Sequence, residues 1–139
     1  MFDGYGIQTW YPFIDIISGL TISGRRYEGE FYMGKKHGKG AYFSGDGLSY
    51  VGMFSRGMYH GYGVLRNSLG DTFNGNFVNS KPSGQQLIEY TNKNKYEGEM
   101  LMGLFQGHGK FTWCNDAGYY EGDWVRGKFH GNGNEVLAL

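Results

Sequence analysis

Residues 27–40 read YEGEFYMGKKHGKG, and they crowd glycine, aromatic and charged residues into one short stretch. Taken alone, Lys39 and the glycines suggest a phosphate-binding loop, and His37 suggests a metal or catalytic site. The stretch recurs, however. Related stretches begin at Tyr50, Phe73, Tyr96 and Tyr120, so that successive starts lie 23 or 24 residues apart. A period of this length indicates that one supersecondary unit is repeated along the chain.

Each unit has the pattern of a β-hairpin. An aromatic residue is followed two places on by glycine and two places later by a large apolar residue, as in Tyr27, Gly29 and Phe31. This period of two puts all three on one face of a strand, and we expect the glycine to leave room for a neighbouring ring to lie flat over the backbone. A turn glycine, a His-Gly-x-Gly segment and a second apolar strand complete the unit. Hairpins in series predict an antiparallel meander whose stacked copies share one core.

The third and fourth units depart from this pattern. Ser80, Ser83 and Gln86 stand where the third unit should carry glycine, histidine and glycine, and Pro82 falls in its expected turn. In the fourth unit Gln106 takes the histidine position. We therefore expect the turns of these two hairpins to differ in shape from the others.

The composition favours one folded domain. The 139 residues include 26 glycines, 12 tyrosines, 10 phenylalanines and 3 tryptophans, a combination that suits short hairpins joined by tight turns. The 13 basic and 13 acidic residues give zero formal charge, so no global field draws the chain to nucleic acid. Cys114 is the only cysteine, which excludes an intrachain disulfide framework. The sequence shows no membrane-spanning run and no signal-peptide pattern, and it predicts a cytoplasmic protein.

The reactive side chains do not form the pattern of an enzyme. Three residues separate Gly34 from Gly38 where a phosphate loop needs four. Equivalent histidines of neighbouring units should lie ~10 Å apart, too far to share a zinc ion, and each is expected to bond a turn carbonyl. Acidic pairs such as Glu28 and Glu30 should lie on a solvated face opposite the rings. We therefore expect no catalytic residue, no metal site and no cofactor.

The combination of Tyr-x-Gly-x-aromatic, a turn glycine and His-Gly-x-Gly resembles the MORN repeat, the membrane occupation and recognition nexus. The resemblance covers residues 27–139, as units at 27–49, 50–72, 73–95 and 96–119 and a truncated unit at 120–139. It implies an all-β fold, namely an elongated single-layer antiparallel meander of hairpins that forms an open twisted sheet about 50 Å long.

The first 26 residues are less regular. The sequence FDGYG at residues 2–6 resembles YHGYG at residues 59–63, which predicts that the chain begins inside a half-repeat. The apolar stretch of residues 7–22 has no phase with the repeat, and we expect it to cover the first open edge of the sheet.

The resemblance implies a scaffold or adaptor that receives a peptide or helix of a partner protein in an aromatic groove. Tyr42, Leu65, Ile88 and Phe111 of the second strands should assist it. Proteins of this kind serve in cilia, flagella or the cortical cytoskeleton, so we expect that setting, together with end-to-end self-association. The groove is assigned to rings with their bases in the core and their outer edges open to the ligand, which are Tyr27, Phe31, Tyr50, Phe54, Phe73, Phe77, Tyr96, Met100, Tyr120 and Trp124.

A second interpretation is attachment to a membrane surface. A local basic cluster could contact phosphoinositide headgroups, with each cation contributing about 1 kcal/mol near an anionic surface. Acidic residues lie among these cations, and later units do not continue the cluster, so protein binding remains the first choice. The cluster consists of Arg25, Arg26, Lys35, Lys36 and Lys39.

Overall fold

The structure is a computed structural model, and it describes the chain except for residues 1–2, 11–12, 15–20, 23 and 138–139. The regular elements within the described residues are all β-strands. They are β1 (Gly4–Thr9), β2 (Phe13–Ile14), β3 (Thr21–Ile22), β4 (Arg26–Tyr32), β5 (Lys35–Phe43), β6 (Ser49–Ser55), β7 (Met58–Arg66), β8 (Thr72–Val78), β9 (Lys81–Glu89), β10 (Lys95–Leu101), β11 (Leu104–Trp113), β12 (Gly118–Val125) and β13 (Lys128–Leu137).

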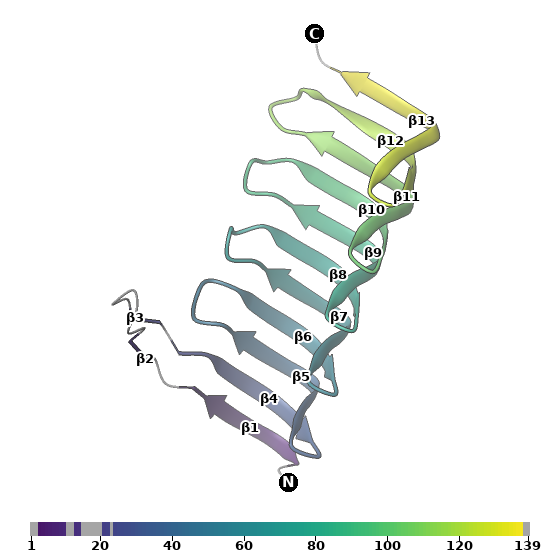
Figure 1. Cartoon of the computed structure of the whole chain (residues 1–139). Helices are drawn as coiled ribbons and strands as arrows, with labels where there is room; N and C mark the ends of the chain where they lie inside the picture. The colour runs from purple at the N-terminus through teal and green to yellow at the C-terminus, as the bar shows by residue number, and fades with distance from the viewer. Residues whose placement is uncertain (1–2, 11–12, 15–20, 23, 138–139) are drawn as a thin grey trace.

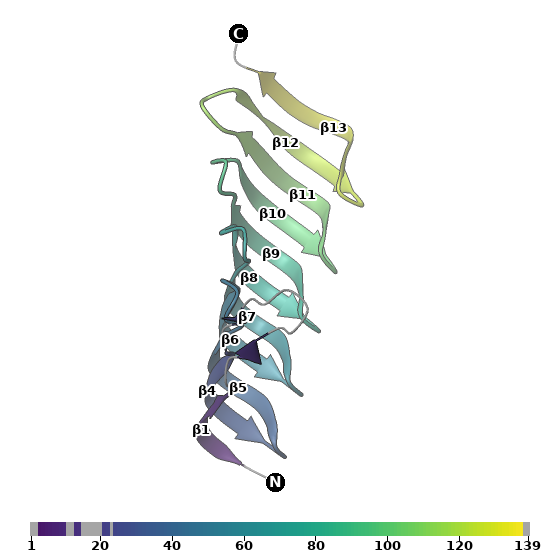
Figure 2. The same ribbon diagram turned by 60° about the vertical axis from the view of Figure 1, so that its left-hand side comes forward.

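Eleven of these strands form one open antiparallel sheet, in the order β1-β4-β5-β6-β7-β8-β9-β10-β11-β12-β13. Strands β2 and β3 pair separately. Figures 1 and 2 show a long single layer, with the tight hairpin turns along one edge and the wider loops between repeats along the other. The predicted meander of hairpins is confirmed. Across the described part of the chain, no helical segment has the length and hydrophobicity needed to cross a bilayer.

Strand β1 takes the place of the second strand of a hairpin. Its Gly6 faces Gly29 of β4, and Gly4 has a φ of 100°, close to the 101° of Gly61 in β7. The likeness between residues 2–6 and 59–63 therefore corresponds to equivalent places in the sheet. Of the stretch predicted to cover the first edge, residues 7–9 belong to β1, and much of the remainder lies outside the described residues.

The five tight turns described within the eleven-stranded sheet have the same shape, so the expectation that the turns of the third and fourth units differ is wrong. Each turn has two central residues with positive φ, the requirement of a type I′ turn. In the third unit these are Asn79 at 49° and Ser80 at 68°, and asparagine tolerates this conformation well. Pro82 lies outside the turn, in β9 opposite Phe77. The five turns are Met33–Gly34, Arg56–Gly57, Asn79–Ser80, Met102–Gly103 and Arg126–Gly127.

The first glycine of each His-Gly-x-Gly segment forms a β-bulge. The register between β4 and β5 shifts between Gly29 and Phe31, and Gly38 on the bulged strand has a φ of 76°. A residue with a Cβ would be strained in this left-handed conformation. The same shift recurs in the later hairpins, and beyond it the residue just before the histidine position lies opposite the large apolar residue of the first strand, as Tyr59 lies opposite Phe54.

The second glycine serves a different purpose, because a tyrosine ring lies on it. A Cβ at Gly63 would come within 2.2 Å of the hydroxyl oxygen of Tyr50, and Gly63 faces Gly52 across the hairpin. The Tyr50 hydroxyl donates a 2.8 Å hydrogen bond to the carbonyl of Met53. The room predicted for a flat ring is therefore present. Equivalent bonds join Tyr27 to Glu30, Tyr96 to Glu99 and Tyr120 to Asp123.

The third unit replaces this arrangement with a glutamine. Phe73 has no hydroxyl and is only half-buried, whereas Gln86 stands at the second glycine position and is buried. The Gln86 side chain fills the space over Gly75, and its Nε2 donates a hydrogen bond to the carbonyl of Asn76. One side chain thus supplies both the filling and the hydrogen bond that tyrosine supplies elsewhere. Its Oε1 is buried without a hydrogen-bond partner, so the replacement is incomplete.

The two roles of glycine predict an order of mutational effects. Gly63→Ala should lower the free energy of unfolding by about 3 kcal/mol, because the new Cβ displaces the buried Tyr50 ring. Gly57→Ala should cost about 1 kcal/mol, because its Cβ meets open space and only its φ of 81° is unfavourable. Urea unfolding of both variants checks the order, and a larger loss at Gly57 would show that ring packing is not what the second glycine provides.

Candidate functional site

The aromatic and large apolar residues that recur in each repeat lie on one face of the sheet, here called the ring face. The tyrosine that begins a repeat and the apolar residue four places later touch edge to face, as Tyr50 and Phe54 do with centroids 5.0 Å apart. These residues form two clusters, one over the first repeats and one over the last, and Phe73 packs against both. The core of this single-layer protein is therefore the first layer of side chains on the ring face.

Most of the rings assigned to the groove lie inside this core. Phe31 and Phe73 are half-buried, and the other eight have at most 6% of their surface exposed. The expectation that their outer edges are open to a ligand is wrong for those eight. They form the floor beneath another layer of side chains, and they are Tyr27, Tyr50, Phe54, Phe77, Tyr96, Met100, Tyr120 and Trp124.

The layer above the floor comes from the second strands. Tyr59 stacks on Tyr50 and Phe105 stacks on Tyr96, each pair with centroids 4.0 Å apart and nearly parallel rings. Both upper rings are half-buried and face outward. They occupy the residue just before the histidine position of the unit. The sequence offered this signal, but that residue varies among Lys36, Tyr59, Pro82, Phe105 and Phe129, and sequence reasoning missed it.

The upper layer opens into a pocket of about 400 Å³ over the last two hairpins. Phe105, Phe111 and Trp113 are half-buried around it, and the buried Trp124 lies beneath. The Trp124 indole donates a 3.0 Å hydrogen bond to the carbonyl of Gly109, which fixes this ring. Gly127 and Lys128 complete the lining. Of the second-strand residues predicted to assist the groove, Phe111 reaches this pocket, whereas Ile88 is fully buried.

Over the first hairpin, the side chain of Lys36 covers the aromatic rings in place of an upper ring. Lys36 Nζ lies 5.3, 5.5 and 5.4 Å from the ring centroids of Trp10, Tyr27 and Tyr42. The Arg25 guanidinium lies over the other part of this group, 4.8 Å from the Trp10 centroid. Burial lowers the pKa of Lys36, and the charge of Arg25 lowers it further. Among the described side chains, the aromatic surface is therefore capped by Lys36 over the first hairpin and holds the pocket above Trp124 toward its C-terminal end.

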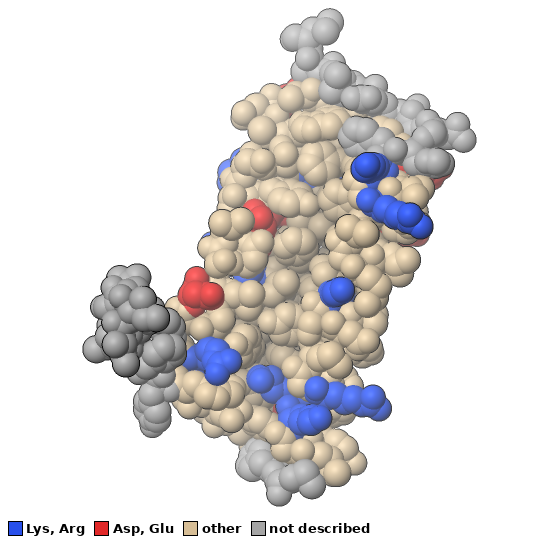
Figure 3. Space-filling model, viewed as in Figure 1, with Lys and Arg blue, Asp and Glu red and all other residues tan. Residues whose placement is uncertain are grey.

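The five cations of the lipid interpretation do not form one patch. Arg26 is paired with Glu28 at 3.1 Å, and Lys36 is half-buried on the ring face beside Arg25. Lys39 is exposed on the opposite face, and Lys35 is exposed beside a hairpin turn. Figure 3 shows basic side chains in separate groups on the viewed face.

The histidine position connects the half-repeat and the second, third and fourth units to the unit that follows each of them. His60 Nδ1 accepts the amide N–H of Asn79 at 3.4 Å, and Gln106 Oε1 accepts that of Arg126 at 3.1 Å. Ser83 Oγ accepts the N–H of Met102, and Asp3 accepts that of Met33. For His60 the predicted bond to a turn carbonyl is wrong, because its Nδ1 accepts a turn N–H from the following repeat, whereas the His130 side chain lies outside the described residues. Histidine, serine, glutamine and aspartate all serve, because each offers an acceptor atom.

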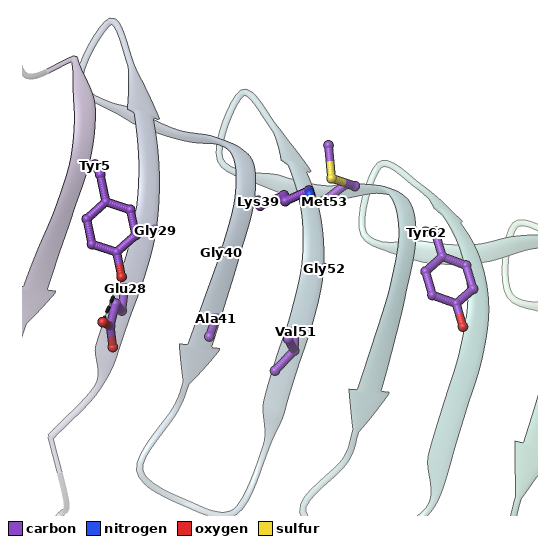
Figure 4. A pocket seen from close by; sticks show the side chains of 10 residues that line it. All are labelled: Tyr5, Glu28, Gly29, Lys39, Gly40, Ala41, Val51, Gly52, Met53 and Tyr62. Atoms are coloured by element: carbon purple, nitrogen blue, oxygen red, sulfur yellow. Dashed lines mark hydrogen bonds between the residues drawn. The ribbon is translucent and has the colours of Figure 1, made fainter.

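The opposite face is more apolar at its N-terminal end than the alternation predicts. A shallow hollow of about 530 Å³ lies between Tyr5 and Tyr62, with glycine backbone, Ala41 and Val51 among its lining. Figure 4 shows how these residues lie along the first strands. The two tyrosine rings are 64% and 62% exposed. Farther along, this face carries charged residues among apolar ones such as Leu87, and Glu97 pairs with Lys95 at 2.8 Å. Among the described residues, no group of three or more histidine, cysteine or acidic side chains could hold a metal ion.

A family model of the MORN repeat matches residues 27–49, 50–68, 96–117 and 120–138, which is more than half of the chain. The chain belongs to the MORN repeat family. Members of this family are non-catalytic repeat modules that bind proteins or membranes. The MORN match omits the third unit, yet β8 and β9 form there the same hairpin as elsewhere. A search among curated proteins found no match.

The acceptor at the histidine position should be exchangeable in this MORN chain. Gln106→Ala should lower the free energy of unfolding by about 1 kcal/mol, because the amide of Arg126 loses its side-chain acceptor. Gln106→His should retain most of the stability, since histidine fills this position at His60. Urea unfolding measures both variants, and equal losses would show that the side chain does not connect the repeats.

The buried tyrosines predict a loss of stability in alkali. Burial raises the pKa of Tyr27, Tyr50 and Tyr59 to about 12, from 10.0. The unfolded chain therefore loses these protons first, and the free energy of unfolding should fall as the pH rises from about 10 to about 12. The lowered pKa of Lys36 acts in the opposite direction, at pH values below about 10.5.

Urea unfolding as a function of pH, with Tyr50→Phe as the comparison, tests this dependence. The variant should lose about 1 kcal/mol near neutral pH with the hydroxyl bond, and its stability should then fall less steeply in alkali. Identical slopes for the two proteins would contradict a raised pKa at Tyr50.

Proposed function

We propose that this chain is a scaffold or adaptor that binds a segment of a partner protein over the C-terminal half of its ring face. The observation that carries the proposal is the open aromatic pocket above Trp124, lined by half-buried Phe105, Phe111 and Trp113. Partly exposed aromatic side chains that converge on one hollow are typical of protein-binding sites. The predicted aromatic groove is retained in this form, with its surface moved from the floor rings to the layer above them.

The floor of this pocket is held in place before any partner arrives. The Tyr96 hydroxyl is bonded to the carbonyl of Glu99 at 2.6 Å, and the Trp124 indole to that of Gly109 at 3.0 Å. Phe105 is stacked on Tyr96. A partner that binds such fixed rings loses little affinity to ordering them, so a short apolar segment of a peptide or helix can be held.

Attachment to an anionic membrane is the alternative function, and the structure favours it less. The predicted cations are spread over both faces of the sheet and the edge with the hairpin turns. Arg26 is paired with Glu28, and Lys36 is half-buried among rings. A dispersed set of cations gives each a separate and weak attraction to a surface.

The cellular setting of the proposal rests on the family resemblance. We assign the chain to the cytoplasm, in a ciliary, flagellar or cortical cytoskeletal assembly where copies associate end to end. Fluorescence imaging of the tagged chain tests this assignment, and an even distribution through the cytoplasm would contradict it. Sedimentation of the purified chain at increasing concentration tests the end-to-end association.

The binding surface is tested with paired variants. Phe105→Ala with Trp113→Ala should abolish capture of the partner from a native extract, because it removes the rings that line the pocket. Val51→Ala with Tyr62→Ala is the matched control, since it truncates an apolar and an aromatic residue that are 53% and 62% exposed on the opposite face. Circular dichroism should show both proteins folded. Truncation of Tyr50, which is fully buried, would confuse binding with unfolding.

Loss of the same captured protein in both double variants would contradict the proposed surface. The membrane alternative is tested in parallel by sedimentation with phosphoinositide vesicles. Binding that disappears with Lys35→Ala and Lys36→Ala, and not with the ring variant, would reverse the order of the two functions.

A further inference from the structure

The hairpin turns carry unusual residues at their tips. The first central position of a type I′ turn favours asparagine, aspartate or glycine, because its φ is positive. Here it holds Met33 at 53°, Arg56 at 53°, Met102 at 48° and Arg126 at 52°, and Asn79 is the one favoured residue among the five. Long side chains are thus placed where the backbone disfavours them and where they project from the edge of the sheet.

These tips and their neighbours are apolar to an extent that turns seldom show. Met33 and Met102 are 50% and 41% exposed, and Tyr32 and Leu104, which flank them, are 58% and 51% exposed. Methionine at a surface adapts its shape to varied apolar partners. Exposed apolar side chains in a row along one edge mark an interaction surface.

The hairpin turns along this edge carry cations and no acidic residue of their own, and Asp3 of the half-repeat lies at the first of them, bound to the N–H of Met33. The four-residue segments 32–35, 55–58, 78–81, 101–104 and 125–128 contain neither aspartate nor glutamate. Each of their cations is exposed, and these are Lys35, Arg56, Lys81, Arg126 and Lys128. We call these five segments the turn edge. Figures 1 and 2 show that the turns follow one another in a nearly straight row.

We propose that the turn edge binds an acidic amphipathic helix of a partner protein. Successive turns are two strands apart, which corresponds to ~10 Å, and seven residues of an α-helix rise ~10.5 Å. Acidic residues that recur every seventh position would therefore meet the cations of the first, second, third and fifth turns, and apolar residues beside them would contact Met33 and Met102. The five turns span ~40 Å, which a helix of about 27 residues matches.

A pocket between the first two turns supports a protein ligand in particular. It has a volume of about 560 Å³ and is lined by Tyr32, Met33, Lys35, His37, Ser55 and Arg56. A recess with an apolar wall and two cations accepts an apolar side chain together with a neighbouring carboxylate. A bilayer is a plane without fixed spacing, so it requires neither the recess nor one long side chain at each turn.

The probe for this proposal is a fluorescein-labelled synthetic helix with glutamate at every seventh position, leucine beside each glutamate and alanine or glutamine elsewhere. The control peptide has the same composition, with its glutamates distributed around all sides of the helix. Fluorescence anisotropy measures binding to the full chain at low and at physiological salt, because pairing with exposed cations weakens as salt rises.

The charge variant is Arg56→Glu with Lys81→Glu and Arg126→Glu. It should weaken binding of the patterned peptide at least tenfold. The matched control is Lys39→Glu with Arg66→Glu and Lys93→Glu, which changes the net charge equally at exposed positions outside the turn edge and should weaken binding less than threefold. Circular dichroism and thermal unfolding verify that both variants fold.

The apolar contribution has a separate test. Met102→Asn should raise the midpoint of thermal unfolding by roughly 1–3 °C, because asparagine suits this φ, and should weaken peptide binding about threefold. A gain in stability together with a loss of binding is not expected if the methionine serves only the fold.

Several results would overturn the proposal. They are equal binding of the two peptides, equal loss in the two charge variants, binding that Met102→Asn leaves unchanged, or no binding of the patterned peptide. Sedimentation with vesicles of phosphatidylserine and phosphatidylcholine completes the test. Vesicle binding that depends on Arg56, Lys81 and Arg126, without peptide binding, would assign the turn edge to a membrane instead.

Discussion

The structure depends on a tyrosine ring lying flat on a pair of facing glycines. At Tyr50 the ring covers Gly52 and Gly63, and its hydroxyl reaches the carbonyl of Met53. This contact covers the backbone of both strands of the hairpin, buries the ring and provides a hydrogen-bond partner for its hydroxyl. A single-layer sheet lacks a second sheet or a helix layer to cover its apolar face, so it must build a core from side chains stacked on its own backbone. The second-strand ring of Tyr59 completes that stack from above.

The repeat and the sheet could be predicted from the sequence because they depend on spacing. Glycine and large apolar residues at alternating positions fix which face each side chain takes, and the 23-residue period fixes how hairpins follow one another. The third unit shows the limit of that reasoning. Gln86 stands at a glycine position. Only the three-dimensional arrangement shows that it also supplies the hydrogen bond of the usual tyrosine, whose position Phe73 occupies in this unit. Comparing the repeats one position at a time does not show that a change at one position compensates for a change 13 residues away.

The candidate site was harder to predict, because knowing which face of the sheet carries a side chain does not tell whether that side chain is exposed. Period-two alternation places Tyr96 and Phe105 on the same side of the sheet, but it does not say which covers the other. In the structure the strongly patterned residue is the buried one, and the variable residue faces outward. Regular positions serve the packing that every unit shares, while variable positions give one repeat chain a surface that another lacks. Lys36 over the first hairpin and Phe105 over the fourth show how far that surface can change without altering the fold.

The acceptor at the histidine position bonds a unit that comes later in the chain. His60, Ser83 and Gln106 each receive an N–H from a turn that lies 19 or 20 residues later in the chain. During synthesis the acceptor therefore leaves the ribosome before the turn that will use it, and both strands of its hairpin precede the next hairpin in the chain. Because the strands of the repeats neighbour one another in chain order, the contacts of each unit do not require the C-terminus. A protein built in this way can assemble one hairpin at a time as it is translated, with little unpaired sheet exposed at any moment.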